Sequence, residues 1–172
     1  MIAELGPSCN DDETFSRMVL EYQEKLLRMC RMYLRDDAAA EDAVQETFLK
    51  AYRALPKFRN ECSEKTWLMR IAVNTCKDMT RSAWFRHTEK RIAWDSLSLP
   101  MEPSGMEEKE ELALAISRLP RKYKDALLLY YYQDMSQEEV AKALSTTPSN
   151  ISKRLKHARN LLREALERGA KQ

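Results

Sequence analysis

The last part of the sequence carries the side chains best suited to contact nucleic acid. Residues 145–172 hold seven basic and two acidic groups. Within them, Ile151, Leu155 and Ala158 recur at helical spacing, with Leu162 one turn further, and this pattern predicts an amphipathic helix to about Arg168. The outward side chains of this helix are basic or able to form hydrogen bonds: Ser149, Asn150, Ser152, Lys153, Arg154, Lys156, His157 and Arg159. Such a face can enter the major groove of DNA.

These outward residues divide by the chemistry they offer. The candidates for base edges are Asn150, Ser152, Lys153 and His157, whereas Arg154, Lys156 and Arg159 suit phosphates. The residues before them predict a partner helix, because Ser136 and Glu139 have the spacing of a capping box. A polar turn at residues 145–147 and Pro148 at a helix start complete a predicted helix–turn–helix over residues 136–159. The alternative is a solvated basic helix in an ordinary bundle.

A second candidate surface is acidic and lies in residues 40–48. Helical spacing directs Val44 and Phe48 inward. The polar side chains are expected to form one exposed strip on the opposite side; they are Glu41, Asp42, Gln45 and Glu46. An acidic strip on a rigid helix suits docking onto a basic helical partner. The alternative is a charged face that only contacts solvent.

A third candidate surface interleaves aromatic and basic side chains. It combines Phe58-Arg59 with the segment 66–81, and its candidate contacts are Phe58, Arg59, Arg70, Asn74, Lys77 and Arg81. This mixture fits single-stranded DNA, because bases stack on aromatic rings and phosphates pair with Arg or Lys. For Trp67 and Ile71 the favoured interpretation is plain core packing.

The elements that must position these surfaces are all helices. Helices are predicted from residues 11–13 onward to about residue 33, over residues 38–55 and from a Ser63 cap to about Arg81. Further helices are predicted over residues 107–119 and 122–132, before the helix–turn–helix. Residues 83–105 contain prolines, a glycine and serines, and predict a flexible linker with some helix around residues 84–93. The predicted fold is therefore all-α, with two small helical domains, residues 1–82 and 106–172, joined by that linker.

The residue inventory argues against enzymes, metal sites and membrane proteins. The two histidines, His87 and His157, fall in the predicted linker and the predicted DNA helix. We find no metal, phosphate-loop or nucleophile-elbow motif, and we expect neither catalysis nor a cofactor. The four cysteines lack CxxC spacing and predict reduced thiols in the cytoplasm. No signal peptide is recognisable, and no stretch approaches the roughly 18 apolar residues of a membrane span.

Three motifs in order resemble the extracytoplasmic-function sigma factors of bacterial RNA polymerase. They are residues 40–48 (AEDAVQETF), residues 66–74 (TWLMRIAVN) and the helix–turn–helix at residues 136–159. The resemblance covers about residues 12–82 and 106–167. The sequence departs from the family at Ser145, where glycine is common in the turn, and at His157, where arginine is frequent.

The resemblance implies that the two predicted domains have different roles. Residues 1–82 correspond to sigma region 2, in which Asp42, Gln45 and Glu46 would bind the clamp helices of the polymerase β′ subunit. The loop at residues 58–63 and the helix carrying Asn74 would capture a flipped base of the −10 element. Residues 106–172 correspond to region 4, which reads the −35 element and rests on the β flap. The linker would thread through the polymerase.

The resemblance also implies partners. They are core RNA polymerase, promoter DNA and an anti-sigma factor, often membrane-anchored, that controls a stress response; no direct membrane insertion is expected. The runner-up hypothesis is a stand-alone dimeric helix–turn–helix regulator whose N-terminal domain senses a ligand. This hypothesis predicts that the protein forms a dimer and binds a palindromic DNA site. The chain offers no obvious additional dimerisation helix, which disfavours this hypothesis.

Overall fold

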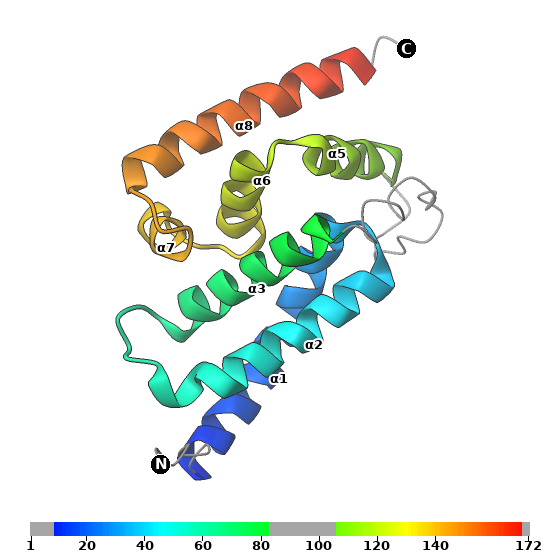
Figure 1. The fold of residues 1–172 in the computed structure, drawn as a ribbon. Helices are drawn as coiled ribbons and strands as arrows, with labels where there is room; N and C mark the ends of the chain where they lie inside the picture. The colour runs from blue at the N-terminus through cyan, green and yellow to red at the C-terminus, as the bar shows by residue number, and fades with distance from the viewer. Residues whose placement is uncertain (1–8, 83–105, 170–172) are drawn as a thin grey trace.

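The computed structural model describes residues 9–82 and 106–169, and its regular elements are all helical in that part of the chain (Figure 1). The first half contains α1 (Cys9–Leu34), α2 (Asp37–Ala54), a 3-10 turn (Leu55–Lys57) and α3 (Glu64–Arg81). The second half contains α5 (Met106–Arg118), α6 (Arg121–Leu127), a π-helical segment (Leu128–Tyr132), α7 (Gln137–Ala143) and α8 (Pro148–Gly169). The predicted all-α class is confirmed. The predicted linker and its helix around residues 84–93 lie outside the described residues.

The first three helices form a bundle whose ends are set by local chemistry. Asp36 caps α2 by accepting a hydrogen bond from the Ala39 amide, and Ser63 caps α3 through the Thr66 amide. Pro56 is the second residue of the 3-10 turn that follows α2, where the chain leaves the α-helix. These boundaries agree with the predicted ones to within a residue or two.

The second half contains the predicted helix–turn–helix. Ser136 and Glu139 form both hydrogen bonds of the capping box at the start of α7. The turn after α7 places Ser145 at a φ of 52°, in the left-handed region that favours glycine. In α8, Ile151, Leu155 and Ala158 are buried as predicted. The outer face of α8 remains exposed to solvent.

The sequence pattern did not reveal the π-helical segment after α6. Residues 122–132 were predicted as one ordinary helix, but the hydrogen-bonding pattern widens at Leu128–Tyr132. The Met135 amide then bonds back to the carbonyl of Leu129 at 3.3 Å, which closes the end of this element. Side-chain periodicity carries little information on such a change, because the segment is only 5 residues long, about one turn, which is too short for a period to be recognised.

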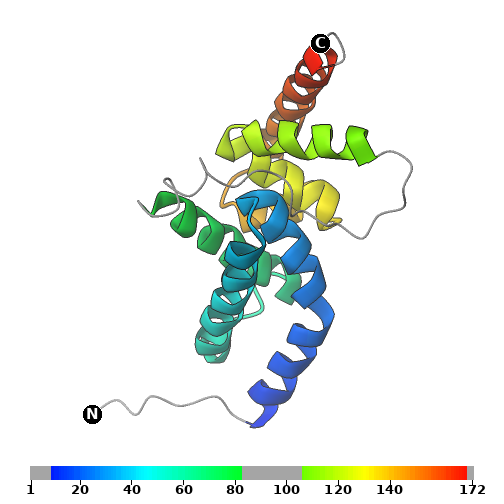
Figure 2. The same ribbon diagram turned by 90° about the vertical axis from the view of Figure 1, so that its right-hand side faces the viewer.

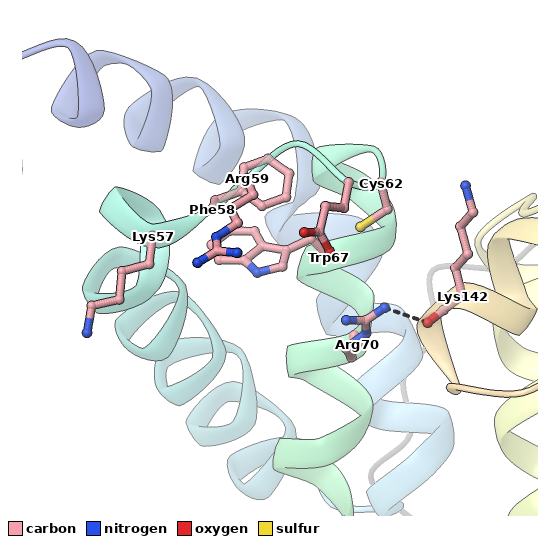
Figure 3. Close-up of a pocket in the computed structure, with 8 residues that line it drawn as sticks. Lys57, Phe58, Arg59, Cys62, Trp67, Arg70 and Lys142 are labelled. Carbon is pink, nitrogen blue, oxygen red and sulfur yellow. Dashed lines mark hydrogen bonds between the residues drawn. The ribbon is translucent and has the colours of Figure 1, made fainter.

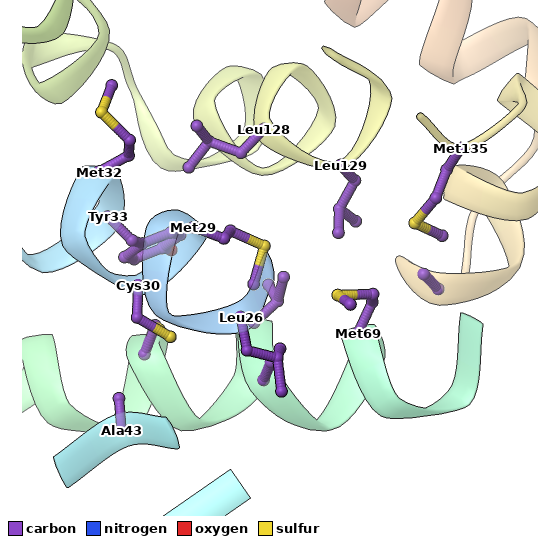
Figure 4. Close-up of a cluster of buried hydrophobic side chains, with 14 of the residues drawn as sticks. Leu26, Met29, Cys30, Met32, Tyr33, Ala43, Met69, Leu128, Leu129 and Met135 are labelled. Atoms are coloured by element: carbon purple, nitrogen blue, oxygen red, sulfur yellow. The ribbon is translucent and has the colours of Figure 1, made fainter. Parts of the chain in front are cut away.

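The two halves pack directly on each other (Figures 1 and 2). The C-terminal helices lie across one side of the N-terminal bundle, and one continuous cluster of buried apolar side chains includes residues of both halves. Figure 4 shows where they meet: Met29 of α1 and Met69 of α3 lie close to Leu128, Leu129 and Met135 of the second half. All five side chains are at most 2% exposed.

The thiols of Cys30 and Cys76 meet inside the first bundle. Their Sγ atoms lie 3.7 Å apart, and both residues are buried. The hydrogen bond to Cys30, together with burial, raises the pKa of the Cys76 thiol well above its ordinary value. Because the neutral thiol is favoured, this pair contributes apolar packing to the bundle.

We predict that Ser136→Ala destabilises the protein by about 1 kcal/mol, because it removes the hydroxyl that satisfies the Glu139 amide at the start of α7. Urea unfolding followed by far-UV circular dichroism measures the change. Ser152→Ala is the matched control, since Ser152 is exposed in the interior of α8 and its loss should leave the stability within about 0.5 kcal/mol. Equal midpoints for Ser136→Ala and the unmodified protein would contradict the capping role.

Candidate functional site

A pocket of about 380 Å³ lies between the loop after α2, the first turns of α3 and the tip of α7 (Figure 3). Its lining combines basic and aromatic side chains; the residues are Lys57, Phe58, Arg59, Glu61, Cys62, Trp67, Arg70 and Lys142. Four of these side chains are cationic and one is anionic. The pocket therefore favours an anionic or polyanionic ligand.

The aromatic floor of the pocket is a stacked pair. The rings of Phe58 and Trp67 have centroids 4.7 Å apart and planes inclined by 29°. Phe58 reaches this position because the 3-10 turn ends beside it, and Asn60, with a φ of 55°, lets the loop turn back toward Ser63. Both rings are half-buried, so part of their area is open to a planar ligand such as a nucleobase.

The wall of the pocket that faces the second half is formed by Arg70 and Lys142. The Nη2 atom of Arg70 donates to the backbone carbonyl of Lys142 at 2.6 Å. Figure 3 shows this bond joining α3 to α7. One of the guanidinium donors of Arg70 is thus occupied by the chain itself.

The six residues predicted for single-stranded DNA are only partly brought together. Phe58, Arg59 and Arg70 line the pocket. Asn74 and Arg81 are exposed further along α3, outside the pocket lining. Lys77 points to the second half instead, where it forms an ion pair with Asp125.

Five of the pocket residues were not among the predicted contacts: Lys57, Glu61, Cys62, Trp67 and Lys142. For Trp67 the favoured interpretation was core packing; its half-buried ring does pack against the core, and it also stacks on Phe58 in the pocket. The interleaving of aromatic and basic residues around it was the signal that could have found it. Nothing in the sequence near Lys142 points to this pocket, because Lys142 arrives from the other half of the chain through tertiary packing.

The acidic strip on α2 differs from its predicted form. Glu41, Asp42 and Gln45 are exposed and Glu46 is half-buried. However, Val44 does not lie opposite them, because Val44, Glu41 and Gln45 line the same depression between α1 and α2. The helical positions of Glu41, Val44 and Gln45 fall within one sector, which the prediction of a purely polar strip overlooked.

That depression continues into an apolar groove along α1 and α2. The second part of the groove has a volume of about 470 Å³ and is lined by Phe15, Val19, Gln23, Val44, Gln45, Phe48, Leu49 and Tyr52. Leu49 is 44% exposed. Glu46 pairs within α2 with Lys50, whose ammonium lies 3.8 Å from the Glu46 carboxylate and 3.8 Å from that of Asp78 on α3. The surface on α2 is thus an apolar groove with an acidic border.

The outer face of α8 presents the predicted polar residues to solvent. Arg154 is half-buried, and the other seven are exposed: Ser149, Asn150, Ser152, Lys153, Lys156, His157 and Arg159. Two of them are oriented by the second half's own aromatic residues. The His157 ring lies 5.8 Å from the ring of Tyr123, and Arg159 donates to the Tyr131 hydroxyl at 3.2 Å.

The turn before α8 orients the first of these residues. The Asn150 amide donates to the Thr147 hydroxyl, and its side-chain amide donates to the Thr146 hydroxyl, each at 3.2 Å. The Thr147 hydroxyl therefore caps the start of α8. A rigid helix start holds the candidate base-reading side chains in place before any ligand arrives.

Among residues 9–82 and 106–169, no group of three or more His, Cys, Asp or Glu side chains is arranged to hold a metal ion. In the same ranges, none of the helices has both the length and the apolar character that crossing a membrane requires.

Comparisons with known proteins give consistent results along the whole chain. The family description "Sigma-70 region 2" matches residues 18–86, and "Sigma-70, region 4" matches residues 109–162. The RNA polymerase sigma-H factor of Pseudomonas aeruginosa is 28% identical over 170 residues, which span 91% of this chain and 88% of that protein. The ECF RNA polymerase sigma-E factor of Escherichia coli is 30% identical over 165 residues, spanning 88% of this chain and 86% of the relative.

Two solved structures share the fold. CnrH in complex with the cytosolic domain of CnrY aligns with a TM-score of 0.70 and 22% identity, covering 91% of this chain and 89% of CnrH. The sigma factor RpoE of Bartonella quintana, solved with the anti-sigma factor NepR, aligns with a TM-score of 0.73 and 23% identity, covering 90% of this chain and 98% of RpoE.

Proposed function

The chain belongs to the extracytoplasmic-function sigma factors, which direct RNA polymerase to promoters, and from this premise we propose how its three surfaces divide that work. Residues 1–82 act as region 2 and residues 106–172 as region 4, with residues 83–105 as the linker. The positions of the two family matches support this division, because one ends at residue 86 and the other begins at residue 109. The observation that carries the proposal is the pocket built on the Phe58–Trp67 stack.

We propose that this pocket receives an unpaired base of the −10 element. The exposed part of the stacked rings provides a platform for a base, and Lys57, Arg59 and Arg70 surround it with positive charge. Flipping a base costs a few kcal/mol, which a preformed pocket offsets only when the strand is already melted or easily melted. Asn74, Lys77 and Arg81 extend the contact along α3 toward the neighbouring phosphates.

The groove between α1 and α2 is proposed as the docking surface for core RNA polymerase. Its apolar floor suits the apolar side of a partner helix, and Glu41 and Gln45 line it with polar groups for basic residues on the same helix. Asp42 and Glu46 add negative charge on the neighbouring surface of α2. The β′ clamp helices are the partner that the family resemblance implies, and the β flap is the expected contact of residues 106–172.

The outer face of α8 is proposed to read the −35 element. Its N-terminal residues are held by the Thr146–Thr147 turn, which is the geometry that places a recognition helix in the major groove. Lys153 and Lys156 are exposed and available to phosphates or base edges. Tyr123 packs beside His157, and Tyr131 accepts a hydrogen bond from Arg159. These contacts restrict the orientations of both side chains and thus the positions on DNA that they can contact.

An anti-sigma factor is proposed as the regulatory partner. The two solved relatives were captured with the cytosolic domain of CnrY and with NepR, which supports this class of partner for the present chain. We expect the protein to act in the cytoplasm, where polymerase and DNA are found, as a binding factor without catalysis. The stand-alone dimeric regulator is not favoured, because both family matches are to sigma-factor regions.

The test of the proposal as a whole is run-off transcription with core polymerase on a promoter library. The purified chain should select a defined subset of promoters, and the chain alone should bind the same duplexes weakly. Tight, sequence-selective binding of duplex DNA without polymerase would instead support the stand-alone regulator.

Phe58→Leu should weaken the open promoter complex, because the substitution keeps apolar bulk but removes the aromatic face. Loss of one stacked base is worth about 1–3 kcal/mol, which corresponds to roughly a 5- to 150-fold loss of open-complex affinity. Filter binding of holoenzyme to a selected promoter measures the change. Phe58→Tyr retains the ring and serves as the matched control. If both variants behave like the unmodified protein, the pocket does not hold a base.

The double substitution of Asp42→Ala with Gln45→Ala should weaken binding to core polymerase about tenfold, because both side chains are exposed on the groove border. Fluorescence anisotropy with labelled protein gives the affinity. Glu167→Ala, also exposed but on α8, controls for the loss of a surface charge. The docking role is excluded if the double variant competes for core polymerase as well as the Glu167 variant does.

Lys153→Ala should lower the salt dependence of promoter binding by holoenzyme by about one unit of the log–log slope, because one phosphate contact is lost. Arg168→Ala is the control; this residue lies at the end of α8 and contacts Glu164. An unchanged slope for Lys153→Ala, or an equal reduction for Arg168→Ala, would show that Lys153 does not contact a phosphate.

A further inference from the structure

Tyr131, which precedes the helix–turn–helix in the chain, forms a polar pair with Arg159 on α8. The Nη1 atom of Arg159 donates to the Tyr131 hydroxyl oxygen at 3.2 Å. Arg159 is exposed, and Tyr131 is 48% exposed although its ring is large and aromatic. The pair therefore lies at the surface, on the edge of the face that is proposed to read DNA.

This pair can still form hydrogen bonds with a ligand. A guanidinium carries five N–H donors, and the bond to Tyr131 uses one of them. A phenol that accepts a bond through its oxygen still has its own O–H to donate. The pair can thus direct donors from both side chains to one anionic ligand.

Arg159 differs from other arginines of this protein in the group that holds it. Arg17 on α1, for example, pairs with the Glu64 carboxylate at 2.7 Å, which offsets its charge. Among the residues that the structure describes, no carboxylate lies within ion-pair distance of Arg159. A phenol is uncharged at neutral pH, so it orients the guanidinium and leaves its full positive charge for a partner.

Two further cations extend the positive surface beside the pair. Lys156, Arg159 and Arg163 follow one another at steps of three and four residues, so they lie along one flank of α8. All three are exposed. When a helix enters the major groove, the middle of its exposed face meets base edges and its flanks approach the phosphates. The flank that carries Arg159 therefore suits the backbone of one DNA strand.

The π-helical segment holds Tyr131 in place. The Tyr131 ring meets the ring of Tyr130 edge to face, with centroids 4.9 Å apart and planes inclined by 82°. Tyr130 is itself half-buried against the core. Short π-helical segments are frequent at functional sites. The Tyr131 hydroxyl is thus oriented before DNA binds, which lowers the entropic cost of the contact.

We propose that Tyr131 and Arg159 together bind one backbone phosphate of the −35 duplex, with Tyr131 contributing from outside the helix–turn–helix. This inference rests on the proposed function of α8 and adds a contact that does not lie on that helix. Arg159 supplies the positive charge. Tyr131 fixes the orientation of the guanidinium and donates its own hydrogen bond to the same phosphate.

The experiment measures binding of holoenzyme to a selected promoter in which one −35 phosphate at a time is replaced by an uncharged methylphosphonate. Tyr131→Phe removes only the hydroxyl, and Arg159→Ala removes the charge. On unmodified DNA, Tyr131→Phe should bind about two- to tenfold more weakly. Arg159→Ala should lower the log–log salt slope by about one unit. At one position the methylphosphonate should weaken binding of the unmodified protein but cost both variants little, because their contact there is already lost.

Tyr132→Phe is the matched control, because it removes the same hydroxyl from the adjacent residue, which is 40% exposed. This variant should keep both the affinity and the methylphosphonate effect of the unmodified protein. Urea unfolding of free Tyr131→Phe should give an unchanged midpoint, since the lost hydroxyl is at the surface, so weaker binding would not reflect a damaged fold.

Unchanged binding by Tyr131→Phe, or an equal loss for Tyr132→Phe, would overturn the phosphate site. The site is also excluded if no position exists at which both variants lose the methylphosphonate effect. The Lys153→Ala variant separates this inference from the proposed function. If Lys153→Ala lowers the salt slope and Arg159→Ala does not, α8 contacts DNA and only the Tyr131–Arg159 site fails. If neither variant lowers the slope, the proposed function of α8 fails as well.

Discussion

The burial of the Asp125 carboxylate is the constraint on which the arrangement of the two halves depends. A charge at 4% exposure requires partners, and it finds Lys77 on α3 and Tyr33 on α1. Burial and the neighbouring carboxylate raise the pKa of Tyr33, so its hydroxyl keeps the proton that it donates. Apolar side chains can shift past one another at little cost. The network of Asp125, Lys77 and Tyr33 is satisfied in only one alignment of the two halves, so it contributes more to the specificity of their packing than to net stability.

This alignment of the two halves determines which of the three candidate surfaces are left exposed. With α3 facing the second half, the groove between α1 and α2 and the outer face of α8 remain exposed. The two exposed surfaces are the ones proposed for polymerase and for duplex DNA. The surface proposed for the melted strand is the one that the interface engages.

The pocket and the α8 face, which are both proposed to contact nucleic acid, are built in two different ways. On α8, adjacent turns of one helix provide the side chains, and the local turn at Thr146–Thr147 orients them. In the pocket, the 3-10 turn, the Asn60 loop and the Ser63 cap must all be in place before Phe58 meets Trp67. The first depends on local structure, whereas the second depends on how two helices are connected.

The sequence by itself determined the helices, their caps and the polar face of α8, because these follow from the spacing of residues within a few turns. It also indicated the family, through three motifs in order. Only the tertiary structure decided that Trp67 lines a pocket, that Val44 lies among the acidic residues of α2, and that Lys77 pairs with Asp125. Lys77 and Asp125 are 48 residues apart in the chain. Helical periodicity describes only near neighbours, so no local pattern could connect them.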